Sequence, residues 1–231
     1  MPTNIEHYDL SGRRAVVVGA NTPAGSAIAA ALTEAGATVS SVDATEDAVA
    51  AGNAVERARD ELGGLEIAVS ATDLFFAKPI AEVTDAELAR VTAANFGVPF
   101  AVARAASAAL AESGSGRLIL VSHVLGERGV TNTSAYGAAH AATQSLVRTL
   151  SQELGPRGTV VNGISLGWME WMQDRLDPAD QEAMRATRFP IMKRTGTGED
   201  VGPMAVWLSG TGAGYVSGQI FTIDGGLLQH L

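Results

Sequence analysis

With 231 residues, 46% of them hydrophobic, the chain is long enough for one sizeable core, and we expect a single domain spanning residues 1–231. A formal net charge of -9, with 16 basic residues scattered along the chain, argues against nucleic-acid and anionic-membrane partners and leaves a small neutral or cationic ligand, or another protein. The absence of cysteine excludes disulfides and thiolate chemistry, and the lack of a signal sequence or a bilayer-length apolar run favours a cytoplasmic protein.

The first part of the chain predicts a strand, a turn, a helix and a second strand. Residues 14–19 (RAVVVG) are typical of a buried strand, the Ala-rich residues 23–36 predict a helix, and residues 38–43 (TVSSVD) predict another strand. This order is the βαβ unit that binds a dinucleotide, with Asp43 placed to reach a ribose hydroxyl. A solvated strand end is the alternative interpretation of Asp43.

The middle of the chain predicts a helix at about residues 46–62, a strand at residues 66–70 and a long helix that starts at Thr84. Thr84 is followed three residues later by a glutamate, which is the pattern of a capping box. The long helix is expected to bend near Asn95, because Pro99 follows closely.

The next stretch carries the most evident chemistry. Residues 118–121 predict a buried strand, and residues 136–150 predict a helix. His123 lies at the exit of the strand, where loops over a parallel sheet tend to carry functional groups. Tyr136 and His140 are four residues apart, so they project from one face of the helix. One phenol and two imidazoles are therefore expected to meet at one site.

The last part predicts a strand at residues 158–165, a helix that begins near Glu199, and a final strand within residues 214–226 (GYVSGQIFTIDGG). Residues 167–195 lie between them and are rich in Trp and Met, which suits a lid over an adaptable apolar pocket or a subunit contact. Packing of a helix onto the core is the alternative for each of its large side chains, which are Trp168, Met169, Trp171, Met172 and Met184.

From Gly12 to Gly226 these elements resemble the short-chain dehydrogenase/reductase family. The resemblance rests on the Tyr-x-x-x-basic helix, the 13-residue spacing before Tyr136, the Asn95 helix and the terminal VSGQIFTIDGG run. It implies an α/β fold with a single-domain, Rossmann-type, doubly wound parallel sheet. It also implies a nicotinamide cofactor, NAD being favoured over NADP by Asp43, and oligomers built through the Asn95 helix, the Tyr136 helix and the last strand.

The resemblance also assigns roles to single residues. In this family the tyrosine matched by Tyr136 is the acid/base, and a serine at position 123 polarises the substrate oxygen. A lysine at position 140 lowers the tyrosine pKa and holds the nicotinamide ribose, and Asn95 matches the residue that holds a relay water. A helix-bend residue without a catalytic role is the alternative for Asn95, and a structural role is the alternative for each histidine.

The chain departs from the family's pattern where cofactor and substrate would bind. Gly19 and Gly25 match the first and third glycines of the T-G-x-x-x-G-x-G turn, but Pro23 takes the place of the second, adding a ring and removing an N–H group. Histidines stand at positions 123 and 140. An imidazole has a reference pKa of about 6.5, so at pH 7 it replaces the cation of lysine only if a carboxylate holds its proton.

Two further departures affect the frame of the site. The interval between Asp43 and Leu65 is too short for the helix, strand and helix that the resemblance implies, so we predict that one strand-helix unit has been lost. The residues Ala71, Thr72 and Asp73 stand where the family has an N-N-A-G-like run. Metal binding is not expected, since the two histidines with Asp73 or Glu170 show no recognised ligand spacing.

Three functions follow, in this order. The first is a catalytically impaired or non-catalytic subunit that forms a homo- or hetero-oligomer with family members and binds NAD poorly. The second is an atypical NAD-dependent oxidoreductase of a small carbonyl or hydroxyl compound, with Tyr136 as acid/base, His123 as substrate donor, His140 in place of lysine and Asn95 in the relay. The third is a non-redox acid/base enzyme of the dehydratase, isomerase or retro-aldol type.

Overall fold

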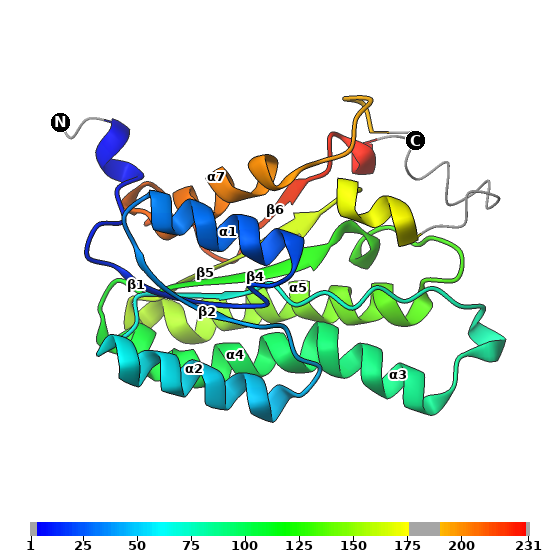
Figure 1. Cartoon of the computed structure of the whole chain (residues 1–231), viewed down its shortest axis with the longest axis horizontal. Helices are drawn as coiled ribbons and strands as arrows, with labels where there is room; N and C mark the ends of the chain where they lie inside the picture. The colour runs from blue at the N-terminus through cyan, green and yellow to red at the C-terminus, as the bar shows by residue number, and fades with distance from the viewer. Residues whose placement is uncertain (1–3, 176–189, 230–231) are drawn as a thin grey trace.

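A six-stranded parallel sheet forms the centre of this computed structural model, which describes residues 4–175 and 190–229 (Figure 1). The strand order is β2-β1-β3-β4-β5-β6. The strands are β1 (Arg14–Val18), β2 (Thr38–Val42), β3 (Ile67–Ser70), β4 (Arg117–His123), β5 (Val160–Leu166) and β6 (Ile220–Ile223). The predicted doubly wound α/β architecture is confirmed.

Helices cover both faces of the sheet (Figure 1). One face carries α1 (Pro23–Glu34) and α7 (Gly198–Ser209), and the other carries α2 (Ala48–Leu62), α4 (Val98–Glu112) and α5 (Ser134–Leu154). Successive strand side chains point to opposite faces, so Ala15 and Val17 of β1 enter the first core while Val16 and Val18 enter the second. Two apolar layers therefore hold the sheet rigid between them.

The edge of the sheet at β2 confirms the predicted loss of a strand-helix unit between Asp43 and Leu65. The chain leaves β2, forms α2 and enters β3 on the other side of β1. In the classic order 3-2-1-4-5-6 a further strand lies outside the second one. The direction of winding reverses between β1 and β3, and in open sheets of this kind ligands bind in the crevice at the carboxyl ends of the strands at such a point.

The long helix predicted from Thr84 is divided by a π-helical turn. The capping box between Thr84 and Glu87 is present and starts α3 (Asp85–Thr92). The residues Ala93–Gly97 form the π-helical turn, and α4 follows directly. The helix is thus interrupted at Asn95, where a bend was predicted, and π-helical turns are often found at functional sites.

The last strand is shorter than its sequence pattern predicts. Only Ile220–Ile223 of residues 214–226 form β6, because the loop before it is held by Asn162 instead of a neighbouring strand. The Asn162 Nδ2 donates to the Val216 carbonyl at 2.6 Å, and its Oδ1 accepts from the Gln219 amide at 3.1 Å. Gly218, with φ of +76°, adopts the left-handed conformation in that loop.

None of the helices in the described ranges is long and apolar enough to cross a membrane.

Candidate active site

A small cavity lies in the crevice at the carboxyl ends of the central strands. Its volume is about 60 Å³. The wall is formed by the turn after β1, the residues after β3, the end of β4, the first turns of α5, and the residues after β5. The cavity therefore occupies the point where the winding of the sheet reverses, which is the expected place for a ligand.

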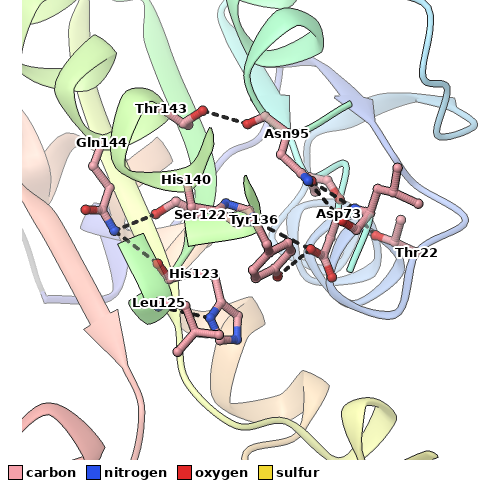
Figure 2. Close-up of polar contacts among 12 residues, drawn as sticks. Thr22, Asp73, Asn95, Ser122, His123, Leu125, Tyr136, His140, Thr143 and Gln144 are labelled. Carbon is pink, nitrogen blue, oxygen red and sulfur yellow. Dashed lines mark hydrogen bonds and ion pairs between the residues drawn. The ribbon is translucent and has the colours of Figure 1, made fainter. Parts of the chain in front are cut away.

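The structure brings Tyr136, His123 and His140 together, as their spacing predicts (Figure 2). The ring centres of Tyr136 and His140 are 4.3 Å apart, and those of Tyr136 and His123 are 5.5 Å apart. All three side chains line the cavity, and none of these residues is more than 2% exposed. Their catalytic roles stay predictions, but their meeting at one site is a property of the fold.

A carboxylate from a fourth residue, Asp73, joins this cluster. The Tyr136 hydroxyl donates to Asp73 Oδ1 at 2.7 Å, and His140 Nε2 lies 3.6 Å from the same oxygen (Figure 2). In the sequence, Asp73 is noticeable as part of the changed N-N-A-G-like run and as a conceivable metal ligand, but no spacing links it to the tyrosine. The register between β3 and β4 explains why these residues meet. Ser70 pairs with Leu120, so Asp73 and His123 each lie three residues beyond a paired position, at the same edge of the sheet.

The two imidazoles differ in their hydrogen bonding. The Nδ1 atom of His123 accepts from the Leu125 amide at 3.1 Å, which places the proton of the neutral ring on Nε2. Neither ring nitrogen of His140 has a hydrogen-bond partner among the described residues, although the side chain is only 2% exposed. His140 is therefore a buried polar ring whose nearest oxygen, that of Asp73, lies just beyond hydrogen-bond distance.

Asn95 fixes the loop that carries Asp73. Its Oδ1 accepts from the Leu74 amide and its Nδ2 donates to the Leu74 carbonyl, both at 2.9 Å. Its own carbonyl accepts from the Thr143 hydroxyl at 2.7 Å (Figure 2). These contacts give Asn95 a structural role in joining the π-helical turn, the Asp73 loop and α5. The predicted relay role is not required to explain them.

Gln144 is a second positioning residue that sequence analysis missed. It lies one turn after His140 on α5 and is buried. Its Nε2 contacts the His123 carbonyl at 3.2 Å and the hydroxyls of Ser122 and Ser165 at 3.4 and 3.3 Å. Its spacing of four residues from His140 was the available signal, because that spacing places both side chains on one helix face.

The glycine turn after β1 is closely packed. A Cβ at Gly19 would lie 2.7 Å from the Ala71 carbonyl carbon, and one at Gly25 would lie 2.0 Å from the Gly19 oxygen. The Thr22 hydroxyl accepts from the Gly25 amide at 3.0 Å and caps α1, whose first residue is Pro23. Both matched glycines are therefore needed by the backbone, whether or not a ligand binds.

This turn fits a dinucleotide pyrophosphate poorly. Such a group binds to free amides in the first turn of a helix. Pro23 has no N–H group, and the Gly25 N–H group already bonds to Thr22. At the other end of the site, the Asp73 carboxylate lies against both Tyr136 and position 140, where the family's pattern places the nicotinamide ribose.

Asp43 lies at the end of β2, next to the residue that contacts the glycine turn. It is exposed and directly follows β2, whose last carbonyl, at Val42, accepts from the amides of Gly19 and Ala20 at 2.8 and 2.9 Å. This position suits contact with a ribose, and that role stays a prediction.

In the described part of the predicted lid, Trp168, Met169 and Met172 are buried in the core and Trp171 packs against it, as the packing alternative proposed. Trp171 and Met172 also line the cavity. Met184 lies outside the described residues. No group of three His, Cys, Asp or Glu side chains in the described ranges is arranged to hold a metal ion.

Known proteins resemble this chain along nearly its whole length. The family model described as enoyl-(acyl carrier protein) reductase matches residues 6–228. The cis-4-hydroxycyclohexanecarboxylate dehydrogenase of Sinomonas cyclohexanicum is 32% identical over 216 residues, covering 92% of this chain and 86% of that protein. The family-model match includes the residues of the cavity, the glycine turn and the Tyr136 helix.

Solved structures agree with the sequence comparison. The crystal structure of a dehydrogenase/reductase from Sinorhizobium meliloti 1021 is similar with a TM-score of 0.87 and 29% identity, over 96% of this chain and 98% of that one. A blue fluorescent protein from a metagenomic library, solved in complex with NADPH, is similar with a TM-score of 0.86 and 26% identity, over 95% and 99%. The chain belongs to the short-chain dehydrogenase/reductase family, whose relatives include dehydrogenases and reductases.

Proposed function

We propose that this chain is a family subunit with little or no nicotinamide-dependent hydride transfer of its own, and that it assembles with an active family member. The observation that carries the proposal is the contact of the Asp73 carboxylate with the Tyr136 hydroxyl at 2.7 Å and with His140 at 3.6 Å. A tyrosine that works as acid/base toward a substrate must direct its proton to that substrate. Here the proton is directed to a carboxylate of the same chain.

The charges around Tyr136 support the same proposal. A phenolate next to an ionised Asp73 would place two negative charges in close contact in a mostly buried site, so the phenol is held in its protonated form. None of the described residues that line the cavity is Lys or Arg. A permanent cation such as the lysine of the family's pattern would stabilise a phenolate near neutral pH, and position 140 carries a histidine instead.

The cofactor side of the site supports weak nicotinamide binding. Pro23 and the Thr22 cap leave fewer amides for a pyrophosphate. The cavity of about 60 Å³ is well below the several hundred Å³ that enclose an organic ligand. Asp43 favours the opposite conclusion, and the NADPH complex of the relative with 26% identity shows that the fold itself accommodates the cofactor.

The proposed assembly uses the outer face of α4 and α5. A groove of about 620 Å³ runs between these helices, with Phe96, Phe100 and Leu150 among its apolar residues. Phe100 is 43% exposed, and the charged residues Arg104 and Glu153 flank it. An apolar centre with a charged rim is typical of a subunit interface. The matching helices of an active family member are the proposed occupant.

Back-substitution tests the loss of cofactor binding. We expect calorimetric titration of the parent chain with NADH to show no saturable binding below the millimolar range. The double variant Pro23→Gly with Asp73→Gly restores a helix amide and removes the carboxylate, so it should bind NADH at least tenfold more tightly. Equal binding by both proteins would refute the assigned roles of Pro23 and Asp73.

Co-expression tests the proposed assembly. The chain is produced together with family members from its own source that retain the Ser, Tyr and Lys pattern, and the native mass and dehydrogenase activity of each complex are measured. We expect one such protein to form a stable complex whose activity survives Tyr136→Phe in this chain. Loss of the activity on that substitution would mean that this chain itself carries the chemistry.

A second candidate function is non-redox acid/base catalysis. The observation that favours it is the meeting of a carboxylate, a phenol and two imidazoles at one cavity. Such groups suit proton transfer in dehydration, isomerisation or retro-aldol cleavage. Activity of the purified chain without any nicotinamide, lost on Tyr136→Phe, would favour this candidate over the first.

A further inference from the structure

His140 is the buried group that the family's chemistry leaves unexplained. Both of its ring nitrogens lack a hydrogen-bond partner among the described residues, and the side chain is 2% exposed. Unpartnered buried polar atoms destabilise a fold, and native proteins usually satisfy them with a protein group, a water or a ligand. His140 also lines the cavity of about 60 Å³, so the missing partner has a place to bind.

The geometry between His140 and Asp73 indicates what this partner must do. Nε2 and Oδ1 are 3.6 Å apart, which is too far for a direct hydrogen bond between them. A single donor atom about 2.8 Å from each would bridge the two. The Tyr136 hydroxyl contacts the same Oδ1 at 2.7 Å, so the Asp73 oxygen is held in place beside His140. The Asp73 oxygen and the His140 nitrogen are therefore placed to share one donor.

We propose that this cavity binds a short primary ammonium group, such as that of methylammonium. An ammonium carries N–H donors and a positive charge, which match the carboxylate oxygen of Asp73 and the imidazole nitrogen of His140. The Asp73 carboxylate in the wall attracts a cation. The net charge of -9 favours approach of a cation.

The cavity also limits the size of the ligand. A cavity must have a volume of at least about 10–15 Å³ to hold one water molecule. About 60 Å³ thus accommodates a few heavy atoms. Beyond the polar atoms, the wall includes Val121, Leu166 and Met172, which suit one or two carbons attached to the nitrogen. Ligands of two or three heavy atoms bind no more tightly than about the millimolar range.

The test is a titration of the full chain with methylammonium chloride, followed by the ¹⁵N signals of the histidine rings. Tetramethylammonium chloride keeps the ionic strength constant and serves as a cation without N–H donors. The His140 signals are assigned by their loss in His140→Gln. We expect saturable shifts of the His140 signals in the millimolar range, and no such shifts with tetramethylammonium or with ethanol.

Two substitutions separate specific binding from general attraction. Asp73→Asn keeps the shape and removes the charge, so affinity should fall about tenfold or more. Asp43→Asn removes an exposed carboxylate and should leave the affinity unchanged. Tyr136→Phe, which changes the volume little, gives a second measurement if Asp73→Asn unfolds, and affinity should fall severalfold.

Three results would each overturn the proposal: no saturable shift of the parent chain, an equal response to ethanol, which would indicate a water site, or equal effects of Asp43→Asn and Asp73→Asn.

Discussion

The contact between Tyr136 and Asp73 predicts a measurable contribution to folding stability. Tyr136→Phe removes one hydroxyl and leaves the ring in place, so no large cavity forms. A hydrogen bond to a charged group contributes about 1.5–3 kcal/mol. The Asp73 side chain is 20% exposed, so water replaces part of the lost bond. We therefore expect the free energy of unfolding to fall by about 1–2 kcal/mol.

Urea unfolding, followed by tryptophan fluorescence, measures this change. Asp73→Ala and the double variant complete a thermodynamic cycle, whose coupling energy isolates the pair. The coupling should be about 1 kcal/mol or more, because residues in direct contact typically show interaction energies of about 0.5–3 kcal/mol. Tyr215→Phe, at a fully exposed tyrosine, is the matched control and should stay within about 0.5 kcal/mol of the parent. Additive effects of the two substitutions would refute the contact.

Three further predictions concern the glycine turn, the Glu87 capping box and the proposed subunit contact. Gly25→Ala should destabilise the fold by at least about 2 kcal/mol, because its Cβ would lie 2.0 Å from a backbone oxygen. The control Gly52→Ala in α2 should stabilise the fold by about 0.5–1 kcal/mol, since the atom nearest to its Cβ would be 3.9 Å away. Urea unfolding of both variants and the parent measures these changes. The Thr84 amide, Lys78 and the Thr84 hydroxyl lower the pKa of Glu87 from 4.5 to about 2, so the stabilisation by ionised Glu87 is present above pH 4.5 and is lost as the pH falls toward 2. Between pH 6 and pH 3 the unfolding temperature of Glu87→Gln should therefore decrease less than that of the parent. Equal decreases would contradict this. Phe100→Lys should lower the native mass of the co-expressed complex, measured by light scattering, without lowering the unfolding temperature of this chain, and an unchanged mass would place the subunit contact elsewhere.

Much of the fold could be predicted because its signals are local. The apolar runs that become β1 and β4 are buried on both faces, and Thr84 with Glu87 forms the capping box that its spacing indicates. The short interval after Asp43 predicted the missing strand-helix unit, because a chain of that length has no room for it. The end of the chain was harder, since the loop held by Asn162 depends on side-chain contacts that no periodicity shows.

The site was predictable only where helical spacing determines it. Tyr136 and His140 share a helix face in any α-helix, and His123 follows the strand before them. Asp73 lies 63 residues from Tyr136 in the sequence, and their contact depends on the register between β3 and β4. The role of Asn95 in holding Leu74 depends on tertiary contacts in the same way. Long-range polar contacts of this kind leave no period in a single sequence.

The most direct measurement of the central claim is a fluorescence titration of the purified parent chain with NADH, beside an active family member that retains the lysine at the matching position. The account predicts that the relative saturates while the parent chain gives no saturable signal below the millimolar range, because Asp73 and Pro23 occupy or remove the groups that would hold the cofactor. Micromolar NADH binding by the parent chain, lost on Asp43→Ala, would contradict it and would favour the atypical NAD-dependent oxidoreductase.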